Sequence, residues 1–205
     1  MSKSAYTLDR CATPTPLLVD EATGRLTYAL CNRRRRCPRC ARIYREKRRV
    51  RFAQGLWTTQ LTLTMPPDFG EVTPANIDRM AKAWTSLSAR LQRRYGRFTY
   101  AGVREGLAGE ERLHALVLLT IFMPRCEQEL ISELAEKAGF GPVVDITPVH
   151  SRRRAVAYVV KSLQGVDRAP DKRWPPNKNS YFTNLPALKR PISRSHWRPV
   201  SPNEM

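Results

Sequence analysis

The sequence has no long hydrophobic run. None of its 205 residues belong to a stretch of about 18 consecutive apolar residues, so it predicts no membrane-spanning helix. Residues 1–10 also lack the apolar segment of a secretory signal. No segment repeats along the chain. These absences together predict a cytoplasmic chain that has no membrane partner.

Acidic residues are also few. Asp and Glu number 18 against 36 Lys and Arg, which gives a formal net charge of +18. Such a charge opposes compaction through self-repulsion, so folding does not explain it, and a polyanionic partner is the simplest explanation. The alternative is a basic surface without a specific partner. Nucleic acid is favoured over a membrane surface because the basic residues do not line one long amphipathic helix.

Cysteine is scarce, but four of the five cysteines lie in residues 1–55: Cys11, Cys31, Cys37 and Cys40. In a cytosolic protein, this clustering favours a metal site over disulfides. The CxxC pair of Cys37 and Cys40 lets one turn supply two thiolates of a tetrahedral zinc site, and the more distant Cys11 and Cys31 would complete it. A redox-active CxxC is the alternative. Cys126 is left over as an ordinary core or surface residue.

Arginines surround these cysteines, and their positive charge would favour thiolates and bring a basic knuckle against phosphate. The predicted DNA contacts of this region are Arg33, Arg34, Arg35, Arg36 and Arg39. A charged helix is expected over residues 41–53, as a solvated face, a phosphate-binding stripe or both. Residues 1–55 are therefore expected to form a cysteine-rich, zinc-binding basic leader.

Residues 56–164 alternate between strand and helix patterns. The pattern predicts strands over residues 57–65, 97–105, 112–123 and 143–149. It predicts helices over residues 73–95, 127–138 and 152–164. The order β-α-β-β-α-β-α indicates an α+β domain with a ferredoxin-like antiparallel sheet and helices packed on one face. Residues 165–205 are basic and rich in proline, and are expected as an extended wrapper or a disordered arm.

One predicted strand carries a histidine on the face of the sheet that is turned away from the predicted helices. Alternation over residues 112–123 turns His114 away from the face that meets the helices. Glu105 lies nine residues earlier across a short turn, so a hairpin would make the two near cross-strand neighbours. A carboxylate and an imidazole are half of a Mg²⁺ or Mn²⁺ site. The alternative is a half-buried histidine that has a carboxylate partner and no metal. Considered without other motifs, Glu105 and His114 favour this alternative.

The last predicted helix has an apolar stripe and an opposite polar side. The stripe comprises Val156, Val159, Val160 and Leu163. Tyr158 and Lys161 lie on the other side with Arg154 beside them. The tyrosine hydroxyl could attack a phosphodiester while Lys161 activates it or holds the phosphate. An exposed surface tyrosine is the alternative.

Taken in order, these segments resemble the HUH endonuclease superfamily, in particular the rolling-circle replication initiator (Rep) proteins of actinobacterial plasmids and filamentous phages. LTLTMP at residues 61–66 resembles their first motif, HALVLL at 114–119 their His-hydrophobic-His strand, and AYVVK at 157–161 their tyrosine motif. The cysteine-rich stretch followed by RIYR at residues 42–45 is similar to the leader of the actinobacterial members. The resemblance covers roughly residues 30–165.

The resemblance implies a metal-dependent tyrosine DNA endonuclease, a nickase or strand transferase. Tyr158 would form a 5′-phosphotyrosine link to the nicked origin strand and free a 3′-OH for a polymerase. Glu105 and His114 would hold the catalytic Mn²⁺ or Mg²⁺. Leu116 stands where the family has its second histidine ligand, so this chain would lose one metal ligand.

Single-stranded or hairpin DNA is the partner that follows, with host replication proteins as further partners. The other expected DNA contacts are Arg154, Thr62 and Thr64.

An initiator-type nickase is the preferred prediction. The alternative is a weakened HUH-derived protein that recognises origin or hairpin DNA without efficient cleavage. A zinc-containing RNA-binding domain of RRM-like topology is the third hypothesis. It would need exposed aromatic residues on the central strands, where the sequence has mainly Thr, His, Glu and Leu.

Overall fold

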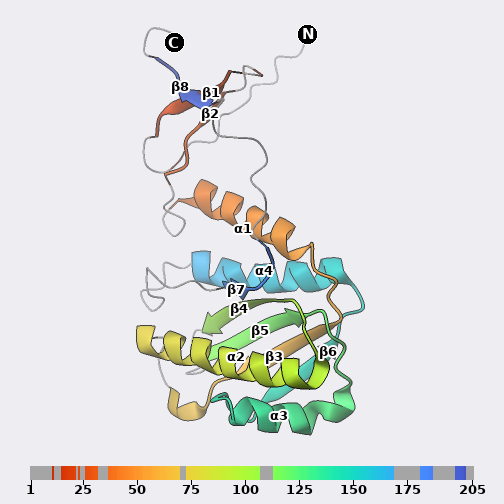
Figure 1. Ribbon diagram of the computed structural model, residues 1–205. Coiled ribbons are helices and arrows are strands. Elements are labelled where there is room, and N and C mark those ends of the chain that lie inside the picture. The colour runs from red at the N-terminus through yellow and green to blue at the C-terminus, as the bar shows by residue number, and fades with distance from the viewer. Residues whose placement is uncertain are drawn as a thin grey trace. The chain divides into compact units, whose positions relative to one another are not determined.

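The computed structural model describes residues 11, 15–21, 23, 26–31, 37–69, 73–106, 113–168, 181–186 and 197–201 (Figure 1). The chain divides into two compact units, one of residues 1–47 with 187–205 and one of residues 48–186. Each unit has its own antiparallel sheet, which confirms the predicted α+β class. No helix in the described ranges combines the length and the apolar composition needed to cross a bilayer.

The first unit holds a three-stranded sheet from both ends of the sequence. Its strands are β1 (Leu17–Asp20), β2 (Leu26–Tyr28) and β8 (Trp197–Pro199), in the order β2-β1-β8. Leu18 in the central strand pairs with Thr27 on one side and Pro199 on the other. Sheets this short bury little apolar surface and are marginally stable alone, so the first unit needs a further source of stability.

Helix α1 (Pro38–Phe52) follows the first two strands. Proline at its first position is pre-organised for helix, and Arg49 and Arg51 in its last turn complement the negative end of the helix dipole. The helix ends at Phe52, which is fully buried. The indole of Trp57 donates a hydrogen bond of 2.6 Å to the Phe52 carbonyl, which fixes the chain where it enters the second unit's sheet.

The second unit is built on a five-stranded sheet. Its strands are β3 (Thr59–Thr64), β4 (Tyr100–Gly106), β5 (Leu113–Leu119), β6 (Val144–Pro148) and β7 (Tyr181–Thr183). Their order is β6-β3-β5-β4-β7, and every neighbouring pair is antiparallel. From β3 to α4, the chain order of strands and α-helices agrees with the predicted β-α-β-β-α-β-α.

Helices α2 (Pro74–Tyr95) and α3 (Gln128–Glu136) cover one face of this sheet (Figure 1). Short 3-10 turns precede them, η1 (Pro67–Phe69) and η2 (Arg125–Glu127). Thr73 caps α2 by accepting a 3.2 Å hydrogen bond from the Asn76 backbone, and Gly96 ends it with a positive φ of 80°. The main core lies between these helices and the sheet, and includes Leu61, Leu63, Ile77, Leu87, Ala115, Val117 and Ile131.

Helix α4 (Arg152–Arg168) packs on the other face of the sheet (Figure 1). The prediction that all helices share one face is therefore wrong for α4. The physical reason is visible in β5, whose even positions Leu116 and Leu118 are apolar as well as its odd ones. A strand that is apolar on both sides must be covered on both. Val156 and Val159 of α4 supply that cover.

The C-terminal stretch was expected as a wrapper or arm, but β7 joins the sheet beside β4. Tyr181 pairs with Val103, and Asn184 accepts a 2.7 Å hydrogen bond from the Tyr100 backbone. Gly102 makes the close approach possible, because a Cβ there would lie 2.5 Å from the Phe182 ring. The expected boundary at residue 165 thus differs from the structure, which groups residues 181–186 with the sheet.

Candidate functional site

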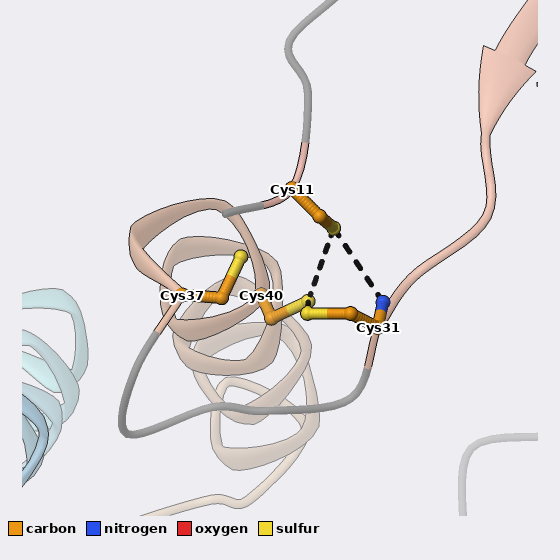
Figure 2. Close-up of side chains that lie close together, drawn as sticks. All are labelled: Cys11, Cys31, Cys37 and Cys40. Carbon is orange, nitrogen blue, oxygen red and sulfur yellow. Dashed lines mark hydrogen bonds between the residues drawn. The ribbon is translucent and has the colours of Figure 1, made fainter. Parts of the chain in front are cut away.

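Four cysteines meet in the first unit (Figure 2). Cys11 precedes β1, Cys31 follows β2, and Cys37 and Cys40 lie at the start of α1. Their sulfur atoms all lie within 4.8 Å of one another, and the Cys40 sulfur is 3.6 Å from those of Cys11 and Cys31. Four sulfurs at about 2.3 Å around a tetrahedral zinc would be about 3.8 Å apart. The thiols are not joined in disulfides, so the group could hold a structural metal such as zinc.

The surroundings of Cys11 favour the thiolate that a metal requires. Burial raises the pKa of the Cys11 thiol, but hydrogen bonds with the Cys31 backbone N–H, the Arg39 guanidinium and Cys40 lower it, and the pKa is lowered overall. The bonds from Cys31 and Arg39 are each 3.5 Å long. Cys37 and Cys40 also lie at the positive end of the α1 dipole, which favours anionic sulfur.

Arg39, between the two cysteines of the CxxC pair, points inward. It is only 9% exposed, and its guanidinium donates to the Tyr28 carbonyl at 2.8 Å, the Ala29 carbonyl at 3.2 Å and the Thr27 hydroxyl at 3.2 Å. With its bond to Cys11, it ties β2 to the start of α1. Arg39 was predicted to contact DNA; the structure instead gives it a supporting role around the cysteine cluster.

The structure describes only some of the other predicted DNA contacts. Four lie outside the described residues: Arg33, Arg34, Arg35 and Arg36. Thr62 is half-buried on β3, whereas Thr64 is only 3% exposed. A buried hydroxyl is not available to a DNA backbone. Cys126 is exposed in η2 and is not part of the cysteine cluster.

Glu105 and His114 are directly paired across β4 and β5, the neighbourhood expected from the sequence. Thr64, which pairs with His114 from β3, shares a 3.0 Å hydrogen bond with the histidine Nδ1. We call these three side chains the Glu105–His114–Thr64 row; they lie on the face of the sheet that α4 covers. Burial raises the pKa of the Glu105 carboxyl. Within the described ranges, only the cysteines form a group of three or more metal-ligating side chains.

Leu116, where the HUH resemblance would expect a second histidine, belongs to the core. It is 5% exposed, pairs with Val103 and Thr62, and lies in the cluster formed with Val156 and Val160 of α4. The row therefore offers a divalent ion one carboxylate and one imidazole.

Tyr158 does not join this row. Val156, Val159 and Val160 turn toward the sheet and are buried, whereas Tyr158 is 55% exposed. Because an α-helix turns about 100° per residue, Tyr158 lies roughly opposite that stripe, away from the sheet. Lys161 is also exposed, so the predicted tyrosine–lysine side exists, but it faces outward.

A run of three arginines opens α4, of which only Arg154 was predicted to contact DNA. Arg152, Arg153 and Arg154 are all exposed, and Ser151 caps the helix by accepting a 3.4 Å hydrogen bond from the Arg154 backbone. The first turn has no acidic residue. Positive charges at the positive end of a helix dipole are unfavourable. The run of three arginines in the sequence was the signal for this feature.

Comparison with protein-family models, with curated proteins and with solved structures finds no match to this chain. The HUH resemblance therefore stays a prediction that depends on the motifs alone.

A first prediction concerns Glu105 in buffer without divalent ions. A raised pKa means that the folded state keeps a proton which the unfolded chain releases, so this stability is present at low pH and lost as pH rises through the raised pKa. Replacing the carboxyl by a neutral amide in Glu105→Gln should therefore raise the Tm at neutral pH. The gain should shrink as the pH falls through the raised pKa and should be absent below the ordinary carboxyl pKa.

Thermal melts with and without Mn²⁺ then test the row as a metal site. If Glu105 and His114 bind the ion, Mn²⁺ should raise the Tm of the wild type and not that of Glu105→Gln. Glu136→Gln, an exposed change on α3, is the matched control and should behave as wild type. A Tm increase of equal size in all three proteins would contradict a site at the row.

Proposed function

We propose that this chain is a DNA-binding protein that recognises single-stranded or hairpin DNA through its basic surfaces. The observation that carries the proposal is the group of exposed basic residues on α4. Arg152, Arg153 and Arg154 are exposed in its first turn and Lys161 is exposed further along the helix, and no residue from 152 to 161 is acidic. Basic side chains bind DNA mainly by neutralising phosphates and releasing counterions. The cost of three arginines at a helix start is offset when an anion binds them.

The charge distribution of the second unit favours α4 over α3 as the surface that contacts DNA. The exposed residues of α3 on the opposite face include Glu129, Glu133 and Glu136. A polyanion is repelled by such a surface and attracted by α4. Exposed basic residues of α2 add long-range attraction, but Asp78 lies among them.

The finer fold assignment belongs to the same proposal. The β-α-β-β-α-β connection and the antiparallel order β6-β3-β5-β4 support a ferredoxin-like sheet, with α4 and β7 added to it. This assignment and the motif order are what support a relationship to HUH replication initiators. We further propose that zinc is the metal of the cysteine cluster, because four thiolates at tetrahedral spacing suit zinc.

Tyrosine-dependent nicking is the second candidate function. The direct pairing of Glu105 with His114, oriented by Thr64, supports a site for a divalent ion. Cleavage also needs the hydroxyl of Tyr158 at a phosphate held near that ion. Because Tyr158 lies on the outward side of α4, DNA binding is the first proposal and nicking the second.

Binding measured by fluorescence anisotropy tests the first proposal, with a labelled single strand, a hairpin and a duplex of the same sequence. The logarithm of the affinity should fall linearly with the logarithm of salt, by about 0.7 per phosphate contacted on a single strand. The combined variant Arg152→Gln, Arg153→Gln, Arg154→Gln should weaken binding and reduce this slope by about 2.

A matched control removes the same charge elsewhere, from exposed residues in and just after α2. It combines Lys82→Gln, Arg93→Gln and Arg97→Gln. If both triple variants lose affinity equally, the α4 surface is not the binding site. If the wild type does not bind any of the three DNAs, the proposed function is wrong. A covalent adduct formed with Mn²⁺, and lost in Tyr158→Phe, would support nicking.

A further inference from the structure

Tyr158 is placed as a surface group, not as part of the core. It is 55% exposed, while the other tyrosines within the described ranges are all at least half-buried. The packing of α4 is carried by Val156, Val159 and Val160, so the tyrosine ring does not serve the sheet contact. An aromatic side chain with this much exposed surface can contact a partner from solution.

Cationic side chains flank the ring along the helix. Arg154 lies four residues before Tyr158 and Lys161 three residues after it, so both are surface neighbours of the ring. Their backbone positions are about 10 Å apart along the helix axis, with Tyr158 between them. Both side chains are exposed, and each is long enough to reach a phosphate.

We propose that this side of α4 is a stacking platform for unpaired DNA bases, in which the Tyr158 ring stacks on one base and Arg154 and Lys161 hold the phosphates beside it. Single-strand binding proteins combine these two elements, an aromatic face for a base and cations for the backbone. The inference depends on the proposed DNA binding and adds which form of DNA is bound and by which residues.

A protein partner fits this surface less well. A base offers a flat π-face together with a phosphate on each side, and so matches both the ring and the charges. An acidic peptide would match the charges and leave the ring without a partner. In duplex DNA the base faces are covered by their neighbours, so the ring would gain nothing there.

Stacking and nucleophilic attack make opposite demands on the side chain, which gives a sharp test. Stacking needs the ring and attack needs the hydroxyl. We expect Tyr158→Phe to bind a labelled oligothymidine strand as the wild type does. Tyr158→Ala should bind it about tenfold or more weakly, since base–aromatic stacking makes a contribution of this order. Neither change should alter binding to a blunt duplex by more than about twofold, because phosphate contacts dominate there.

Abasic oligonucleotides complete the test. The wild type should lose affinity when bases are removed from the strand, and Tyr158→Ala should lose much less, because its stacking contact is already gone. Phe122→Ala, which removes an aromatic ring that is 62% exposed after β5, is the matched control and should bind normally. Thermal melts confirm that each variant is folded.

The outcomes separate this inference from the proposed function. If the wild type binds the single strand and Tyr158→Ala binds equally well, the stacking platform is overturned and DNA binding stands. If Tyr158→Phe loses as much affinity as Tyr158→Ala, the hydroxyl is required and the platform is again overturned. If the wild type binds no DNA, both are wrong.

Discussion

Removal of the metal from the four-cysteine cluster is expected to unfold the first unit and to leave the second unit folded. The first unit has three strands of only three or four residues and little else to stabilise it. A structural zinc site contributes about 10–16 kcal/mol of binding free energy, which in such small domains is folding free energy. The second unit has two large apolar clusters and no residue in the metal site.

Metal analysis of the purified chain should find one zinc per molecule. Two-dimensional NMR before and after chelation should then show loss of the dispersed amide signals of residues 15–21, 26–31 and 37–47, with those of residues 59–69, 73–106 and 113–160 retained. Cys40→Ser, which removes the sulfur that lies 3.6 Å from two of the other three, should give the same result without a chelator. Cys126→Ser is the matched control, because this exposed thiol is outside the cluster. A dispersed spectrum from the metal-free first unit would contradict the structural role.

The second large effect is expected from Phe182→Ala, which should lower the free energy of unfolding by about 3 kcal/mol. The ring of Phe182 fills the space left by Gly102 and packs on Trp84, with ring centres 5.2 Å apart. The Arg104 guanidinium lies over the same ring, 4.8 Å from its centre. Because the ring is only half-buried, the expected loss is at the lower end of the range for buried phenylalanines.

Urea unfolding followed by far-UV circular dichroism measures this loss. Phe122→Ala removes the same ring from an exposed position and should change stability by less than about 0.5 kcal/mol. Gly102→Ala should destabilise the chain through the same contact, since its Cβ would meet the Phe182 ring. Equal stability of Phe182→Ala and the wild type would mean that β7 adds nothing to the sheet.

Elements with strong local signals were predictable from the sequence. Helix α2 was predicted over residues 73–95 and spans Pro74–Tyr95, because a capping threonine, a proline at the first position and a terminal glycine all mark its ends. Alternation along β5 also predicted which face of the sheet each side chain lies on. It correctly put His114 on the face opposite the main core. Both depend on neighbours within a few residues.

Pairings between distant segments were not predictable. Strands β1, β2 and β8 have three or four residues each, too few for a periodic pattern, and β1 pairs with a strand far away in the sequence. Strand β7 was missed for the same reason, since Phe182 becomes a sheet residue only when Gly102 leaves room for it. Which distant segments pair cannot be read from the residues within any one segment of the sequence.

The candidate site also has features that were predictable from local sequence and features that depend on distant segments. The cysteine cluster was predicted because thiols have few other reasons to gather, and the CxxC spacing is local. The inward position of Arg39 was not predictable, because its hydrogen-bond acceptors belong to β2 and the residue after it. The outward position of Tyr158 followed from the helix period, but its separation from His114 depends on which face of the sheet α4 covers.

The pairing of β1 with β8 sets an order for assembly during protein synthesis. Residues 17–20 leave the ribosome long before residues 197–199, so the first unit cannot complete its sheet until the second unit has been made. Contacts of such long sequence separation form late. The four thiols are meanwhile exposed to oxidation, and early capture of the ion by the nascent chain would protect them until their last strand arrives.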